Sequence, residues 1–325
     1  SARVTRLLDI AKLTDDFRDD DYPSIAVADD TTAWVVWQSY SGQSDQIRLS
    51  KYDKGWRTFT LVPGGSGDVW RPQVALDEQA RPWVVWSQQV KGNFDVYARL
   101  LDEKSNTWQK LFRLSTHSDP DIDHHLVSDS RGGLWVVWQG FRGNNSDIFL
   151  RHYDGSEWSD EIRVTDHAAN DWEPRIGVDG RGRAYIAWDT YRNGNYDVYL
   201  RVLEDGRLGP EIPVASTPRF EAHASVAVDR SDRLWVAWDE GGVNWGKDTG
   251  LTVDPNWADH LQKSWDDWLI RSGFPGTRLY DSRQVNLAVF ENGQRRMPVQ
   301  QLEVALKAAG APACDYPQLI ADPRS

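Results

Sequence analysis

The sequence is poor in sulfur and has no long apolar run. It contains one cysteine, Cys314, and one methionine in 325 residues. A disulfide framework within the chain and a cysteine-based zinc site are therefore excluded. No stretch approaches the roughly 18 consecutive apolar residues of a membrane-spanning helix, so we predict no membrane insertion.

Positive charge is also scarce. The chain has 37 Lys and Arg against 49 Asp and Glu, which gives a formal net charge of -12. No basic stripe interrupts this acidic excess, and a phosphate backbone would be repelled by it. We therefore predict no nucleic-acid partner.

Tryptophan and glycine are abundant instead, with 18 and 25 residues, and much of the tryptophan lies in a repeat. Five similar segments end at Trp37, Trp86, Trp138, Trp188 and Trp238: AWVVW, PWVVW, LWVVW, AYIAW and LWVAW. They recur about every fifty residues. A period of this length is typical of propellers and other repeat architectures.

Other residues keep the same register. An aspartate stands nine residues before four of the repeat tryptophans, at Asp77, Asp129, Asp179 and Asp229. A second strand follows each of the first four segments and begins at Asp45, Asp95, Asp147 and Asp197. A weaker strand such as KLFRLS, EIRVT or EIPVA closes the unit. Because both aspartate sets repeat, we interpret them as structural, with the second set bonding local amides.

Four short strands per unit predict an all-β fold, a β-propeller with blades of about 50 residues. Radial packing buries both faces of each blade, and the repeat tryptophans fill the spaces between blades. There are five complete repeats. RLLDIAKLTDD (6–16) and YPQLIAD (316–322) resemble the last and first strands of one further split or incomplete blade. We expect one propeller domain over residues 1–325, taken from a longer protein.

The fifth repeat carries an insertion, residues 239–283, between its second and third strands. Asp254-Pro255 resembles a helix start, and Trp257, Leu261, Trp265, Trp268 and Leu269 follow at helical spacing. The pattern predicts a helix over 255–271. It would be either a buttress on a blade edge or a lid over a binding site.

Six equivalent positions differ in chemistry from blade to blade. Counting six residues back from each repeat aspartate reaches the start of the first strand, at Tyr22, Arg71, Asp123, Glu173, His223 and Tyr316. Packing positions would hold similar residue types. A mixture of carboxylates, imidazole, guanidinium and phenol within a symmetric frame indicates a functional site at the mouth of the central channel.

This ring supplies the candidate catalytic residues. Asp123 and Glu173 can act as acid and base in glycoside cleavage. His223 paired with a tyrosine suits proton abstraction from a uronate, and Arg71 is the fourth candidate. The candidate ligand-binding residues are Tyr22, Trp70, His124, Trp172, Trp245 and Tyr316.

No metal site and no cofactor are predicted. Within Asp121–His125, the neighbouring His124 and His125 of a strand would point to opposite faces and could not share one ion.

Motifs such as RNGNYDVYLR (192–201) and VSDSRGGLWVVW (127–138) resemble those of bacterial TolB-like and sialidase-type (BNR-like) repeat propellers. NWGKDTG (244–250) and the long insertion are similar to those of bacterial propellers that a PHP-like metallohydrolase domain often follows. The resemblance implies a periplasmic or extracellular protein and a C-terminal catalytic domain in the natural chain.

Three functions fit these observations. The first is a ligand-binding or scaffolding propeller that recognises glycans or supports an adjacent catalytic domain. The alternative is a glycan-active enzyme, a glycoside hydrolase or polysaccharide lyase, with its site at the channel mouth. The third is a protein-interaction hub on the opposite face, which would expose a large apolar patch.

Overall fold

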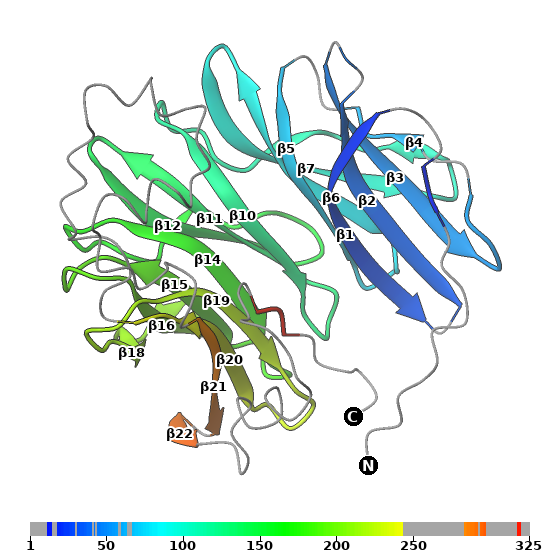
Figure 1. Cartoon of the computed structure of the whole chain (residues 1–325). Coiled ribbons are helices and arrows are strands. Elements are labelled where there is room, and N and C mark those ends of the chain that lie inside the picture. The colour runs from blue at the N-terminus through cyan, green and yellow to red at the C-terminus, as the bar shows by residue number, and fades with distance from the viewer. Residues whose placement is uncertain are drawn as a thin grey trace, which may run out of the picture. The chain divides into compact units, whose positions relative to one another are not determined.

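Every regular element that the computed structural model describes is a β-strand (Figure 1). The described residues are 12–14, 18–29, 31–40, 42, 44–57, 60–63, 67–242, 283–291, 293–296 and 317–319. None of them forms a helix with the length and hydropathy needed to cross a membrane. The predicted helix over 255–271 lies outside the described residues, as do Trp245 and Tyr316.

The strands form five antiparallel sheets whose long strands follow one another in chain order. These sheets are the blades, and the predicted β-propeller fold is confirmed. Blade 1 contains β1 (Asp19–Asp29), β2 (Thr32–Tyr40), β3 (Asp45–Asp53) and β4 (Thr60–Leu61). Blade 2 contains β5 (Val69–Leu76), β6 (Pro82–Val90), β7 (Asn93–Asp102), β8 (Thr107–Trp108) and β9 (Phe112–Arg113).

The later blades repeat this order (Figure 1). Blade 3 contains β10 (Asp121–Ser128), β11 (Leu134–Arg142), β12 (Asn145–Tyr153) and β13 (Ile162–Arg163). Blade 4 contains β14 (Asp171–Val178), β15 (Ala184–Thr190), β16 (Asp197–Glu204), β17 (Arg207–Leu208) and β18 (Ile212–Ala215). Blade 5 contains β19 (Glu221–Val228), β20 (Leu234–Glu240), β21 (Gln284–Glu291) and β22 (Gln294–Arg296).

The chain divides into two compact units, Ser1–Ile122 and Asp123–Ser325, with the division inside β10. In the first unit, an apolar cluster joins blades 1 and 2 and includes Trp34, Val74 and Trp86. In the second unit, one cluster joins blades 3 and 4 and another joins blades 4 and 5. The five repeat tryptophans are between 0 and 4% exposed, which confirms their predicted packing role.

Both sets of repeated aspartates have structural partners. Asp179, for example, accepts the amides of Arg181 and Arg183, the Arg183 guanidinium and the Tyr185 hydroxyl. Asp77, Asp129 and Asp229 bind their turns in the same way. In the second set, Asp147 and Asp197 accept the side-chain amides of nearby asparagines, in agreement with the predicted local amide bonding. Asp95 and Asp147 in addition pair with arginines of the fourth strands. That partner is not apparent from local spacing.

Residues 317–319 lie against blade 5 as a first strand would. The Leu319 amide donates to Ser225 Oγ at 2.9 Å, as the Val74 amide of blade 2 donates to Ser24 Oγ of blade 1 at 3.3 Å. Leu319 and Val74 stand three residues after equivalent ring positions. This contact agrees with the prediction that the repeat pattern continues into a further blade there.

We expect Trp138→Ala to lower the free energy of unfolding by roughly 3–5 kcal/mol. The indole is fully buried, so the substitution removes its packing contacts and leaves a cavity. The matched control is Trp56→Ala, because Trp56 is 37% exposed and should cost little. Denaturant unfolding of both variants measures the difference. Equal losses would contradict the assigned packing role.

Candidate functional site

The first strands of blades 1, 2, 4 and 5 each contain a β-bulge near their start. Pairing between the first two strands shifts register at Asp21/Ser24, Trp70/Gln73, Trp172/Arg175 and Ala222/Ser225. The five described ring residues have left-handed backbones: Tyr22 (φ 52°), Arg71 (φ 50°), Asp123 (φ 49°), Glu173 (φ 47°) and His223 (φ 55°). Residues other than glycine rarely adopt this conformation, and bulges re-aim side chains. The ring positions are thus a repeated structural device with a variable side chain.

A side chain from the preceding blade binds several of these bulges. Gln38 Oε1 accepts the Arg71 amide at 3.4 Å, and Gln139 Oε1 accepts the Glu173 amide at 3.5 Å. Asp189 Oδ2 accepts the His223 amide at 2.8 Å. Each of these acceptors directly follows a repeat tryptophan. We call this position the capping position.

The capping position was not among the sites predicted from the sequence. Its occupants in chain order are Gln38, Ser87, Gln139, Asp189 and Asp239. The first three are neutral and the last two are carboxylates. This change of charge within a repeat was the available sequence signal, and it points to blades 4 and 5.

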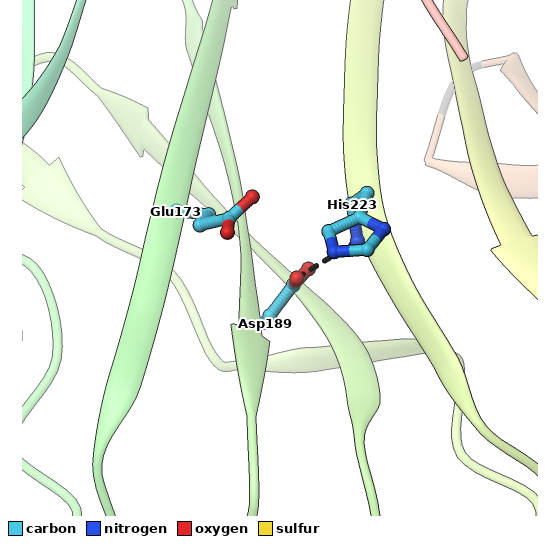
Figure 2. A group of neighbouring side chains, drawn as sticks. All are labelled: Glu173, Asp189 and His223. Atoms are coloured by element: carbon cyan, nitrogen blue, oxygen red, sulfur yellow. Dashed lines mark hydrogen bonds between the residues drawn. The ribbon is translucent and has the colours of Figure 1, made fainter. Parts of the chain in front are cut away.

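Glu173, Asp189 and His223 converge in the second unit (Figure 2). They come from β14, β15 and β19, and their side chains are directed toward one another. One oxygen or nitrogen of each lies within 4.8 Å of the other two. Glu173 and His223 are partly buried, whereas Asp189 is 2% exposed. We call these three residues the acidic–histidine group; such a donor set can hold a divalent cation.

His223 is oriented by Asp239. Its Nδ1 lies 2.8 Å from Asp239 Oδ1, and Asp239 forms an ion pair with Arg283. Burial lowers the pKa of His223, but the Asp239 hydrogen bond and nearby carboxylates outweigh it and raise the pKa above its usual value. Because Nδ1 faces Asp239, Nε2 is the ring nitrogen that can serve the acidic–histidine group.

Asp189 has a displaced protonation equilibrium. Burial is the largest cause and the negative charge of Glu173 the second, and together they raise the pKa of Asp189 to about 7. The amide of His223 lowers this pKa but does not reverse the effect. Two adjacent carboxyl groups thus differ in environment, which is a common feature of acid–base sites.

A row of aromatic rings leads to His223. Ring centroids are 5.5 Å apart for Trp172 and Tyr196, 5.2 Å for Tyr191 and Tyr196, and 5.3 Å for Tyr196 and Phe220. Phe220 meets His223 edge-on at 6.0 Å. Burial, followed by the charges of Asp189 and Glu173, raises the pKa of Tyr196. The row is therefore electrostatically linked to the acidic–histidine group. Of its residues, only Trp172 was predicted from the sequence.

The other described candidates are not members of the acidic–histidine group. In the first unit, the Arg71 guanidinium lies over the rings of Tyr22 and Trp70, at 5.4 and 4.8 Å from their centroids. In blade 3, Asp123 is partly buried and His124 is buried. The carboxyl partner of Glu173 in the acidic–histidine group is Asp189, whereas the partner predicted from the sequence was Asp123. The role of each of these candidates stays a prediction.

A cavity of about 490 Å³ lies at the opposite end of blades 3 and 4. It is lined by turn residues such as Asp129, Arg181 and Asp205 and by the strand residues Trp135 and His152. No residue of the acidic–histidine group or the aromatic row contributes to this cavity.

We expect Asp189→Asn to change how stability depends on pH. In the unfolded chain the carboxyl ionises near 3.8, and in the fold near 7, so the fold binds the extra proton between these values. Wild-type stability from this group therefore falls as pH rises from about 4 to about 7. Asparagine cannot ionise and still offers an oxygen to the His223 amide, as Gln139 does for Glu173.

The stability of the variant relative to wild type should rise across that pH range, by up to about 1.4 kcal/mol for each unit of displaced pKa, and then level off. Urea unfolding between pH 4 and 8, with EDTA present, measures it. Parallel pH curves for the two proteins would contradict the displaced equilibrium.

Comparison with known proteins supports the fold. No protein-family model and no curated protein sequence matches the chain. Similar solved structures include a Dyadobacter fermentans protein of unknown function, with a TM-score of 0.53 and 11% identity over 68% of this chain and 75% of that one. Another is the α-L-arabinanase of Penicillium chrysogenum complexed with arabinobiose, with a TM-score of 0.51 and 10% identity over 68% and 77%. A third is the Fusarium graminearum α-L-arabinofuranosidase with arabinobiose, with a TM-score of 0.50 and 14% identity over 67% and 76%. The chain thus shares its fold with these proteins.

Proposed function

We propose that the chain is a glycan-active enzyme, a glycoside hydrolase that uses Glu173 and His223. The observation that carries this proposal is their meeting at the end of an aromatic row, within 4.8 Å of each other. Both are partly buried and so able to touch a ligand. Aromatic faces suit the apolar face of a sugar ring, and the adjacent polar groups suit its hydroxyls and glycosidic bond.

The local charges favour a neutral sugar. Glu173, Asp189 and Asp239 supply three carboxyl groups, against His223 and Arg283, and Arg283 is already paired with Asp239. A uronate would bring a further carboxylate close to Glu173 and be repelled. Hydrolysis of neutral glycans therefore fits this site better than β-elimination from uronates, the lyase alternative.

Glu173 and His223 take complementary roles. His223, with its raised pKa, donates the Nε2 proton to the glycosidic oxygen as the bond from that oxygen to the anomeric carbon breaks. The Glu173 carboxylate bonds to the anomeric carbon and forms a glycosyl ester. Water then cleaves the ester, losing a proton to the neutral His223.

The short separation of these groups favours a retaining reaction. An inverting enzyme needs room for a water molecule between its catalytic groups, about 6.5–9.5 Å for two carboxyls. The corresponding distance here is at most 4.8 Å. Direct attack by Glu173 is therefore the better fit, and proton NMR of the released sugar would show the original anomeric configuration first.

Arabino-oligosaccharides are the first substrates to test, because two structures of similar fold contain arabinobiose. The assay panel should also include neutral xylo-, gluco- and galacto-oligosaccharides and a polygalacturonate. Binding without turnover by wild type would favour a glycan-binding propeller, our first interpretation of the sequence.

We expect Glu173→Gln to lower kcat at least about 100-fold while the fold is kept, because the bulge and its Gln139 contact do not require a charge. Release of reducing sugar measures kcat, and circular dichroism checks the fold. The matched control is Glu204→Gln, an exposed carboxyl at the end of β16, which should keep full activity. Full activity of the Glu173 variant would place catalysis elsewhere.

We expect Tyr196→Ala to raise KM roughly 3- to 10-fold with a smaller change in kcat, because the lost ring stacks on a sugar before and during reaction. Tyr40→Ala, at an exposed tyrosine of β2, is the control. A fall in kcat at unchanged KM would instead give Tyr196 a role in the chemical step.

The wider setting belongs to the same proposal. The TolB-like and BNR-like motifs support a periplasmic or extracellular protein with one propeller domain and an insertion at 239–283. The likeness of NWGKDTG (244–250) and the insertion to bacterial propellers that such a domain often follows supports a PHP-like metallohydrolase domain after the propeller in the natural chain. Expression of the full natural reading frame with fractionation of the cell would test location and domain content together.

A further inference from the structure

The acidic–histidine group has the composition and spacing of a metal site. From these features we propose that Glu173, Asp189 and His223 bind one divalent cation. The three donor atoms lie within 4.8 Å of one another. Small side-chain rotations would place each donor atom about 2.0–2.6 Å from a shared ion, the distance at which imidazole nitrogen and carboxylate oxygen bind such ions.

The fold holds the three donors on separate, rigid elements. Glu173 and His223 stand on equivalent bulges of β14 and β19, and Asp189 stands on β15 between them (Figure 2). Asp189 is further fixed by the amides of His223 at 2.8 Å and Ala224 at 3.5 Å. Donors fixed by backbone contacts need little reordering when an ion arrives.

The hydrogen bond of His223 to Asp239 orients its ring in the way that metal-binding histidines are usually oriented. Metal-binding histidines commonly donate their second ring N–H to a carboxylate, which fixes the tautomer and makes the ligand more basic. Asp239 Oδ1 lies 2.8 Å from His223 Nδ1, and Arg283 pairs with Asp239. This arrangement leads from the proposed ion through an imidazole to a carboxylate and a guanidinium.

A cation would also relieve the repulsion between two adjacent carboxyl groups. A carboxyl oxygen of Glu173 lies within 4.8 Å of one of Asp189, so a positive charge between them stabilises both in their ionised form. One imidazole with two carboxylates suits Zn²⁺ or Mn²⁺ better than Mg²⁺ or Ca²⁺, which prefer all-oxygen sites.

Cation binding has a consequence for the proposed function, and this part rests on that function. The Glu173 carboxylate cannot ligate an ion and attack an anomeric carbon at the same time. His223 with Nε2 on a metal carries no proton to donate. The ion would therefore inhibit turnover, and the site would exist in a catalytic form and a metal-bound form.

The binding test uses the whole chain without glycan. After EDTA treatment and dialysis, isothermal titration with Zn²⁺ and with Mn²⁺ should give one site per chain for at least one of them. At an ion concentration of 100 times Kd, Tm should rise by about 4 °C. Glu173→Gln and His223→Gln should each weaken binding at least tenfold, whereas Glu204→Gln should bind as wild type does.

The inference would be overturned if neither Zn²⁺ nor Mn²⁺ bound with one site per chain. It would also be overturned if the Glu173→Gln variant bound the ion as tightly as wild type. Hydrolysis is assayed separately in EDTA and with added ion, and added ion should lower kcat. Activation by the ion would refute the inhibitory role. Cleavage in EDTA by a protein that binds no ion would leave the proposed function standing. Ion binding by a protein that cleaves no glycan would leave the metal site standing and contradict the proposed function.

Discussion

The site depends on a hydrogen bond between neighbouring blades. A non-glycine residue with a left-handed backbone lies near the start of each described first strand, and its conformation costs of order 1–3 kcal/mol. In blades 2, 4 and 5, a side chain from the capping position of the preceding blade accepts that residue's amide. The repeat tryptophan beside each capping residue packs into the core, so capping residue and bulge are fixed together. These contacts stabilise the left-handed backbone that sets the direction of each ring residue's side chain.

Because the backbone device repeats, chemistry arises by substitution within it. A neutral cap such as Gln139 satisfies the amide of Glu173 and adds no charge. Asp189 satisfies the amide of His223 in the same way but brings a carboxyl into the interior beside Glu173. Asp239 then binds the imidazole of His223. Two substitutions at one repeated position thus convert a structural contact into a charged group.

The repeat made the fold predictable, and the ring could be found because its members break the repeat. The period located all five blades and the buried tryptophans. Counting from Asp179 and Asp229 reached Glu173 and His223 without any structure. Asp189 and Tyr196 were missed for a physical reason. Both belong to the site through contacts between strands and between blades, and such contacts produce no regular spacing in the sequence. For Asp189, the signal was the change of charge at equivalent positions of the repeat.

The position of Arg283 links the insertion to the site. Arg283 immediately precedes β21, at the end of the segment that interrupts blade 5. Its guanidinium pairs with Asp239 and lies 3.8 Å from the centroid of the Phe220 ring. One side chain therefore contacts both the carboxylate that orients His223 and the last ring of the aromatic row. Since Asp239 is fully buried, loss of its cation would leave an uncompensated charge. The return of the chain from the insertion into the blade is thus part of the construction of the site.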